Sequence, residues 1–189
     1  MINYNKLFGR LGNQMFQGAY LLAQVDKGLI PDIYVQDEKY FTNVREEVRL
    51  MYSQDIPAPV DMVAIHVRRA GNPINPDEPN YSDNPFMVNL CDTYYYQDAM
   101  ALFPKEQFLV FSDDIEWCRK QDMFAGCEFY HGTELEDMNL MAACKGIIMA
   151  NSSFSWWSAY LSNGKVVAPK QYYADGKQRT KLLDSWIQI

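Results

Sequence analysis

The chain has 189 residues, of which 48% are hydrophobic, and this composition excludes an intrinsically disordered protein and allows one domain with a buried core. The formal net charge is -7, which argues against an extended nucleic-acid-binding surface because such a surface needs clustered Lys and Arg. A small anionic ligand is compatible with this charge, since roughly two or three well-placed Arg side chains can hold a diphosphate.

No targeting or membrane segment is evident in the sequence. Residues 1–7 lack the apolar core of a signal peptide, and no apolar run reaches the ~20 residues that a membrane-spanning helix needs. The four cysteines lack the close spacing of a zinc or redox site, so we expect each to act as a small, half-buried apolar residue. These features predict a soluble, cytoplasmic protein, which could still work at a membrane surface.

The first predicted unit spans residues 1–58 and is a small α/β part with a Gly-rich turn. The spacing of apolar residues after Asn13 predicts a helix that ends near Lys27, and a turn from Gly9 to Gly12 precedes it. Residues 37–57 are charged and lack a clear period, so no element is predicted there. Short strands are expected on either side of the helix, at residues 2–8 and 30–35.

The second predicted unit, residues 59–189, alternates short apolar runs with helical segments. Such alternation is typical of an α/β domain with a Rossmann-type parallel sheet flanked by helices. The strands are predicted at residues 60–67, 107–111, 127–130, 146–150 and 166–169. The helices are predicted at residues 93–103, 134–144 and 151–163, with a further helix that Ser112 or Asp113 caps and that ends at Gln121. Residues 70–90 are rich in proline and predict a long surface loop.

Polar residues follow three of these strands at their carboxyl ends. Ligands of open α/β sheets bind outside the carboxyl ends of the strands, so we expect these residues to form one site. The three groups are His66, Arg68 and Arg69; Ser112, Asp113 and Asp114; and Asn151, Ser152 and Ser153.

Arg68 and Arg69 have the donor geometry that phosphate oxygens need, because a guanidinium presents a rigid fork of N–H groups and stays charged. When a sugar leaves a nucleoside diphosphate, negative charge grows on the β-phosphate, and a guanidinium placed there stabilises it. The alternative is a pair of strand-end arginines that form surface ion pairs, which are common and weak. His66 shares a strand face with Arg68, so it is either a site residue or a half-buried core histidine.

Two further segments have both a binding and a structural interpretation. Residues 151–153 either hold a phosphate at a helix start or act only as N-caps. The turn from Gly9 to Gly12, which includes Arg10 and precedes Asn13, either lets the backbone approach an anion or is an ordinary tight turn.

Acidic residues of the second unit are weighed in the same way. Asp137 lies early in a predicted helix, where it either favours the helix dipole or accepts N–H donors from a guanine ring. No third carboxylate at a useful spacing joins Asp113 and Asp114, so no metal site is predicted.

Six segments carry recognisable motifs in a fixed order along the chain. Together they resemble the bacterial-type α-1,2-fucosyltransferases of glycosyltransferase family 11. The matching segments are G-R-L-G-N-Q-M-F-Q at 9–17, H-V-R-R at 66–69, Y-Y-x-x-A at 95–99, F-S-D-D-x-x-W-C at 111–118, D-x-x-L-M at 137–141 and N-S-S-F-S-W-W at 151–157.

The resemblance implies an inverting, metal-independent transfer of L-fucose from GDP-fucose to a hydroxyl of a glycan acceptor, with no cofactor other than the donor substrate. It implies a GT-B-like fold in which residues 59–189 bind the GDP-sugar. Arg68 would hold the β-phosphate, His66 and Asp137 would contact the nucleoside, and Arg68 and His66 are the catalytic candidates. The donor-binding candidates are Gly9, Arg10, Gly12, Asn13, Arg69, Ser112, Asp113, Asp137, Asn151, Ser152 and Ser153.

The sequence also departs from the family pattern. Gly71 stands where the family has Asp after H-V-R-R-G, and Lys145-Gly146 stands where a histidine is often found. The segment before His66 is short, which indicates a reduced N-terminal domain. Two alternatives therefore stay open: a catalytically weak protein that binds GDP or a GDP-sugar, and a transferase of another GDP-sugar.

Overall fold

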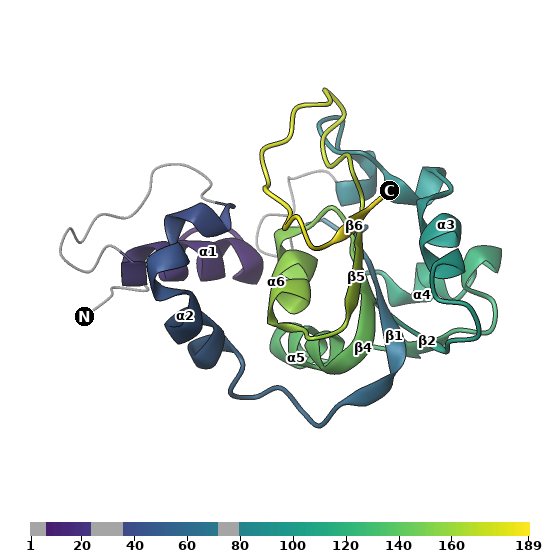
Figure 1. Ribbon diagram of the computed structural model, residues 1–189. Helices are drawn as coiled ribbons and strands as arrows, with labels where there is room; N and C mark the ends of the chain where they lie inside the picture. Colours follow the sequence, from purple (N-terminus) through teal and green to yellow (C-terminus); the bar gives the residue numbers. More distant parts are fainter. Residues whose placement is uncertain (1–6, 24–35, 72–79) are drawn as a thin grey trace.

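A parallel β-sheet forms the centre of the molecule (Figure 1). The computed structural model describes residues 7–23, 36–71 and 80–189, and six strands of one sheet lie within these residues. Every pair of neighbouring strands is parallel. The strands are β1 (Val60–Val67), β2 (Phe108–Ser112), β3 (Glu128–Tyr130), β4 (Cys144–Ile148), β5 (Lys165–Ala168) and β6 (Ile187–Gln188).

The strand order is β3-β2-β1-β4-β5-β6, so the chain moves outward from β1 in one direction and then from β4 in the other. This is the order of the doubly wound, Rossmann-like fold. Connections that leave β1 and β4 in opposite directions open a crevice outside the carboxyl ends of these two strands, where such folds bind ligands. The sheet therefore brings the residues after Val67 and those after Ile148 to one place.

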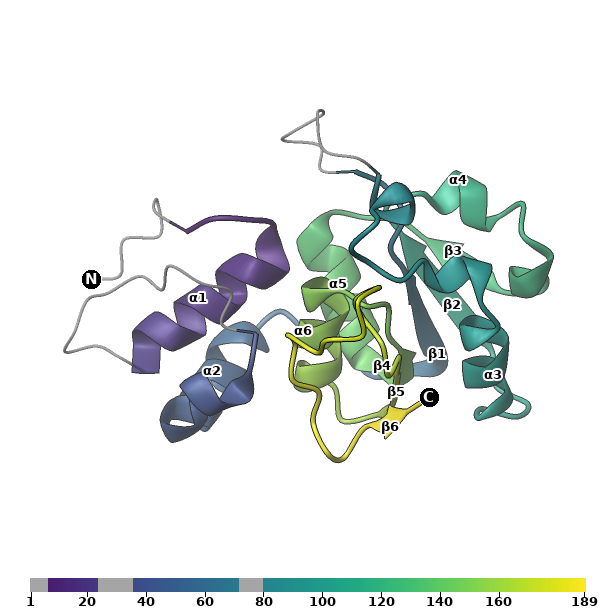
Figure 2. The ribbon, with the colours of Figure 1, turned by 90° about the horizontal axis from the view of Figure 1, so that it is seen from above.

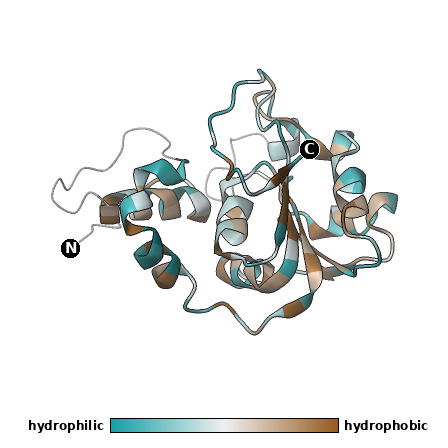
Figure 3. Ribbon diagram, in the orientation of Figure 1, coloured by the Kyte–Doolittle hydropathy of each residue, from teal (hydrophilic) through white to brown (hydrophobic). Residues whose placement is uncertain are grey.

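Helices cover both faces of the sheet (Figure 2). Along β1, Ala64 packs into the core on the side of α5 and α6, whereas Val63 and Ile65 pack into the core on the side of α3 and α4. Burial on both faces explains why this strand is almost continuously apolar. Figure 3 shows the strands largely in the hydrophobic colour and the long C-terminal segment largely in the hydrophilic one. The helices are α3 (Tyr95–Ala101), α4 (Ile115–Cys118), α5 (Glu134–Ala143) and α6 (Ser153–Leu161).

Helices α1 (Leu11–Ala23) and α2 (Arg45–Tyr52) pack beside α6 rather than against the sheet (Figure 1). The ring of Phe16 lies 4.6 Å from that of Trp156 and 4.9 Å from that of Trp157, measured between centroids. From α2, the hydroxyl of Tyr52 donates to the carbonyl of Met15 at 3.2 Å. Short 3-10 helices occupy Glu38–Tyr40, Thr42–Val44, Tyr81–Asp83, Leu90–Asp92 and Asp122–Phe124.

The segment between β5 and β6, residues 169–186, has no helix or strand but is firmly attached to the domain. The indole N–H of Trp156 donates to the carbonyl of Lys181 at 2.9 Å, and Met87 and Tyr173 form an antiparallel bridge. Several side chains of the segment are buried, namely Tyr172, Thr180, Leu182 and Trp186. These anchors fix the segment over the carboxyl ends of the strands.

The predicted α/β fold with a parallel sheet flanked by helices is confirmed. Helix α1 begins at Leu11, two residues earlier than predicted, because the carbonyl of Arg10 accepts the N–H groups of Asn13 and Gln14, so the Gly-rich turn is itself the helix start. Strand β4 begins at Cys144 instead of residue 146. The predicted strand at 30–35, residues 2–6 of the first strand and the last turn of the first helix lie outside the described residues, and the division at residue 58 stays a prediction.

Two elements were missed and the bounds and cap of one predicted helix were wrong. Helix α2 lies in the segment 37–57, where no element was predicted, and strand β6 was not predicted either. Neither Ser112 nor Asp113 caps α4: the N-cap is Asp114, whose Oδ1 accepts the N–H of Trp117 at 3.3 Å, and the helix ends at Cys118 instead of Gln121. Asp113 is unavailable as a cap because its carboxylate binds arginines and backbone N–H groups.

Helix α2 has a single buried residue, Val48, and this explains why its periodicity was invisible. Replacing Val48 by Ala is expected to lower the free energy of unfolding by about 2 kcal/mol, because it removes methyl groups from a packed core. Leu50 on the same helix is 70% exposed, so Leu50→Ala is the matched control and should change stability by less than about 0.5 kcal/mol. Urea denaturation measures both variants, and equal effects would show that α2 does not dock through Val48.

Candidate functional site

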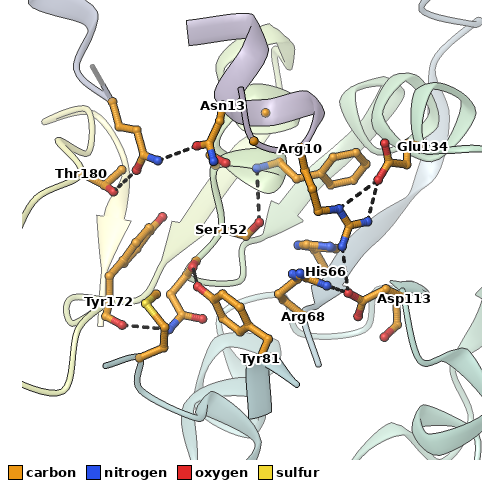
Figure 4. A pocket seen from close by; sticks show the side chains of 18 of the residues that line it. Arg10, Asn13, His66, Arg68, Tyr81, Asp113, Glu134, Ser152, Tyr172 and Thr180 are labelled. Atoms are coloured by element: carbon orange, nitrogen blue, oxygen red, sulfur yellow. Dashed lines mark hydrogen bonds and ion pairs between the residues drawn. The ribbon is translucent and has the colours of Figure 1, made fainter. Parts of the chain in front are cut away.

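A cavity of about 530 Å³ lies outside the carboxyl ends of β1 and β4, at the predicted crevice. The start of α1, the starts of α5 and α6, and the segment 172–180 close around it (Figure 4). Two of the predicted site residues, Arg69 and Asp114, do not line the cavity. Those that do are Gly9, Arg10, Gly12, Asn13, His66, Arg68, Ser112, Asp113, Asp137, Asn151, Ser152 and Ser153.

The carboxylate of Asp113 organises the charged side of this cavity. Its Oδ2 forms an ion pair with the guanidinium of Arg68 and lies 3.6 Å from Nη1 of Arg10. Its Oδ1 accepts the backbone N–H groups of Arg69 at 2.9 Å and of Ala70 at 3.1 Å. One carboxylate at the end of β2 thus fixes the chain after β1 and orients two arginines from distant parts of the sequence.

The contacts of Asp113 assign it a positioning role. A carboxylate would repel the phosphate oxygens of a donor, which argues against direct donor binding by Asp113. A guanidinium has five N–H donors, so an ion pair with one carboxylate is compatible with a second, anionic ligand on Arg68. Ser112, the neighbour of Asp113, also has a structural contact, because its hydroxyl accepts the N–H of Asp114 at 3.0 Å.

Arg69 points to a different environment from Arg68. Its guanidinium carbon lies 3.7 Å from the centroid of the Trp117 ring, and its Nε lies 3.5 Å from Oδ2 of Asp114. Adjacent residues of an extended segment project to opposite sides, which explains the separation of the two arginines. This position does not support the predicted donor contact of Arg69, and we assign it to holding α4 against β1.

His66 is buried in the wall of the cavity, where its ring centroid lies 5.3 Å from that of Phe154. Burial, reinforced by the positive charges of Arg68 and Arg10, lowers the pKa of His66 to about 3. The imidazole is therefore neutral at physiological pH. A neutral imidazole in this place can exchange hydrogen bonds with a ligand without adding to the charge that Arg68 already supplies.

The start of α6 and the start of α1 meet at Gly12. A Cβ atom on Gly12 would lie 2.6 Å from the backbone nitrogen of Phe154, so only glycine permits this approach. The indole N–H of Trp157 donates to the carbonyl of Gly12 at 3.0 Å and locks the contact. Ser152 is the N-cap of α6, and its hydroxyl accepts the N–H of Phe154 at 3.2 Å. Two helix N-termini, which carry partial positive charge, thereby border one cavity.

Asn151 connects the loops around the cavity. Its side-chain amide donates to the carbonyls of Val88 at 2.8 Å and Tyr172 at 3.0 Å. Its own carbonyl accepts a short hydrogen bond from the hydroxyl of Tyr81, and the ring of Tyr81 lies 5.0 Å from the guanidinium carbon of Arg68. These contacts indicate a positioning role, because the donor group of Asn151 is already engaged.

Asp137 lies at the other border of the cavity, in the first turn of α5. Its Oδ1 accepts the N–H of Gly132 at 2.8 Å, which folds the β3–α5 loop back onto the helix. A capping box between Thr133 and Glu136 begins the helix. Burial raises the pKa of Asp137, while the hydrogen bond from Gly132 acts in the opposite direction.

Several lining residues were missed by sequence reasoning. Gln36 donates to Oδ1 of Asn13 at 2.7 Å, and its own carbonyl accepts the N–H of Lys181 at 2.9 Å. Tyr172, Tyr173, Arg179 and Thr180 also line the cavity. All of these residues lie outside periodic elements, so no hydrophobic pattern marks them and only the tertiary structure brings them to the site.

The described part of the chain lacks the side-chain groupings of a metal site and the helices of a membrane span. Within residues 7–23, 36–71 and 80–189, no group of three or more His, Cys, Asp or Glu side chains could hold a metal ion. Over the same residues, none of the helices combines the length and the apolar character needed to cross a bilayer.

The lowered pKa of His66 predicts a pH dependence of stability. In the unfolded state His66 binds a proton below about pH 6.5, whereas in the folded state it does so only near pH 3. The unfolded state therefore gains a proton first as the pH falls. Folding stability is highest above pH 6.5 and decreases as the pH falls towards 3. Between pH 7 and pH 5 the free energy of unfolding should fall by about 2 kcal/mol more for the native chain than for His66→Gln. Urea denaturation at the two pH values measures this difference, and identical pH dependences would contradict it.

Comparison with known proteins gives a consistent result. The family model described as "Glycosyl transferase family 11" matches residues 35–189. An alpha-1,2-colitosyltransferase of Escherichia coli is 33% identical over 166 residues, which cover 73% of this chain and 54% of that protein. The O-antigen biosynthesis glycosyltransferase WbnK of Escherichia coli is 27% identical over 188 residues, which cover 92% of this chain and 59% of that protein.

A mammalian relative matches a smaller part of this chain than the two bacterial proteins do. A galactoside alpha-(1,2)-fucosyltransferase 1 of Saimiri sciureus is 30% identical over 141 residues, which cover 66% of this chain and 37% of that protein. No solved structure gives a significant match. The chain spans a little over half the length of its two bacterial relatives. The family match extends over the whole Rossmann-like sheet and the residues that line the cavity after β1, and we conclude that the chain belongs to glycosyltransferase family 11.

Proposed function

We propose that this chain binds a GDP-sugar in the cavity and transfers its sugar to a hydroxyl of a glycan acceptor. The sugar that we propose is L-fucose. The observation that carries the proposal is the placement of Arg68 beside the N-terminus of α6, outside the carboxyl ends of β1 and β4. The relatives whose names state alpha-1,2-colitosyl or alpha-(1,2)-fucosyl transfer support this reaction class.

The cavity suits a diphosphate for three independent reasons. Arg68 and Arg10 supply positive charge that Asp113 holds in place. The first turn of α6, with Ser152 and Ser153, offers backbone N–H groups that attract phosphate oxygens. Gly12 lets the start of α1 approach closely without a side chain in between. These features would place the diphosphate between Arg68 and the start of α6.

The nucleoside would then extend towards α5. Asp137 lines the cavity there, and its Oδ1 accepts the N–H of Gly132. A carboxylate has further acceptor positions, and these can accept the ring N–H and amino donors of guanine. Neutral His66 lies in the wall beside Arg68 and would contact the nucleoside as a hydrogen-bonding group.

The chemistry follows from where charge develops. As the bond between the anomeric carbon and the β-phosphate oxygen breaks, that oxygen takes the electron pair. The oxygen of the acceptor hydroxyl forms the new bond to the anomeric carbon, and its proton passes to solvent water. Arg68 and the helix N-termini are placed to stabilise the developing charge, because they are oriented before the reaction begins. Attack from the opposite face of the sugar would invert the anomeric centre, and this route needs no metal ion.

A specific observation keeps a second function open. In the segment 66–71, Gly71 stands where the family's H-V-R-R-G-D motif has Asp. A chain that retains Arg68 but lacks this carboxylate could bind GDP or a GDP-sugar with little turnover.

The shared premise of both functions is tested by GDP affinity. Arg68→Ala is expected to weaken GDP binding about 10- to 100-fold in isothermal titration calorimetry, because it removes charge-assisted hydrogen bonds to the diphosphate. Arg119→Ala is the matched control, since Arg119 is half exposed and lies outside the cavity against Phe129. Arg68→Lys, which keeps the charge without the fork, should give an intermediate affinity. Unchanged GDP binding by Arg68→Ala would remove the assigned site.

Turnover separates the enzyme from the binding protein. We expect the chain to release GDP from GDP-fucose faster than from GDP-mannose in the presence of a galactoside, which a coupled assay for GDP measures. Tight GDP binding without turnover of either donor would favour the binding protein instead.

A further inference from the structure

A second hollow of about 300 Å³ lies next to the cavity, and Pro85, Phe86, Met87, Tyr173, Asp175 and Arg179 line it. Met87, Tyr173 and Arg179 line the large cavity as well, so the two spaces adjoin each other. We call this hollow the Phe86 groove. Its walls come from residues 85–87 and from the segment between β5 and β6, and of its lining residues Pro85, Phe86 and Asp175 do not line the large cavity.

Phe86 is exposed to a degree that the fold does not explain. Its side chain is 76% exposed, yet its backbone is fixed on both sides. Its N–H donates to Oδ1 of Asn84 at 2.9 Å, and its carbonyl accepts the N–H of Ala174 at 3.0 Å. The antiparallel bridge between Met87 and Tyr173 holds the neighbouring residues. A fixed backbone places this aromatic ring before a ligand arrives, so little backbone entropy is lost when a ligand packs on it.

The opposite wall offers an oriented hydrogen-bond acceptor. The carboxylate of Asp175 accepts two hydrogen bonds from the guanidinium of Arg179, at 3.1 and 2.6 Å, and one from the N–H of Lys177 at 3.0 Å. Its side chain is 45% exposed, so it remains accessible from solvent. The guanidinium of Arg179 also lies 4.7 Å from the centroid of the Tyr173 ring, which orders both groups.

We infer that the Phe86 groove is the subsite for the acceptor sugar, and that Phe86 packs against one face of a hexose while Asp175 accepts hydrogen bonds from its hydroxyls. A hexose has an apolar face of C–H groups and a rim of hydroxyls, and it matches an aromatic surface beside a fixed polar group. The adjacency of the two spaces supports this occupant, because an acceptor must lie beside the sugar of the donor. The inference rests on the proposed transfer reaction and adds the site of the acceptor.

The test uses NMR titration of the isotope-labelled chain with lactose, a β-galactoside, in the presence of saturating GDP. Resonances of Phe86, Met87 and Tyr173 should shift on addition of lactose, and Phe86→Ala should weaken lactose binding about 5- to 20-fold while GDP affinity stays unchanged. Phe86→Trp should restore or strengthen binding. Tyr94→Ala is the matched control, because Tyr94 is 78% exposed but lies away from both spaces, and it should bind lactose as the native chain does.

The outcomes separate this inference from the proposed function. GDP binding without any lactose binding, or equal lactose affinity of the native chain and Phe86→Ala, would overturn the acceptor subsite alone. Failure of the native chain to bind GDP would instead overturn the donor site on which the inference rests. Asp175→Asn provides a second variant at the opposite wall, and it should also weaken lactose binding without changing GDP affinity.

Discussion

The contacts of the Asp113 carboxylate join the parts of the site to one another. Asp113 directly follows β2. Its carboxylate binds the backbone after β1, the guanidinium of Arg68 and the guanidinium of Arg10. Two arginines would otherwise repel each other in a partly buried space, so a shared carboxylate lets both point into one cavity. Arg10 in turn binds Glu134 at the start of α5, with 3.1 Å from Nε to Oε1. A chain of charges thus connects α1, β1, β2 and α5.

Topology explains why this network forms where it does. The order β3-β2-β1-β4-β5-β6 leaves one crevice, between the connections that follow β1 and β4. Arg68 follows β1, and the N-cap Ser152 follows β4, so the sheet alone brings a fixed guanidinium to a helix N-terminus. The close approach of Gly12 to α6 then adds the N-terminal part of the chain to the same site. The segment between β5 and β6 completes the wall, through Tyr172 and Thr180, and carries the Phe86 groove on its outer side.

The sequence was informative where a residue's role depends on local pattern. The buried strands β1 and β4 and the polar residues at their ends were predictable, because apolar runs followed by polar groups reflect the parallel sheet itself. The cap of α4 was assigned to Ser112 or Asp113 instead of Asp114, since nothing in F-S-D-D tells which carboxylate caps α4 and which binds arginine. The donor contact of Arg69 stays a prediction, and its guanidinium lies over Trp117 because neighbouring residues of an extended segment project to opposite sides. Gln36, Tyr172 and Thr180 lie in segments without periodicity, and only long-range contacts bring them to the cavity.

The central claim is that a nucleoside diphosphate binds with its diphosphate between Arg68 and the start of α6. A crystal structure of the chain with GDP tests it most directly. We predict β-phosphate oxygens within roughly 3 Å of the guanidinium of Arg68 and of the first N–H groups of α6, with guanine against Asp137. GDP bound elsewhere, or bound in the cavity with its phosphates away from Arg68, would show that Arg68 does not hold the diphosphate.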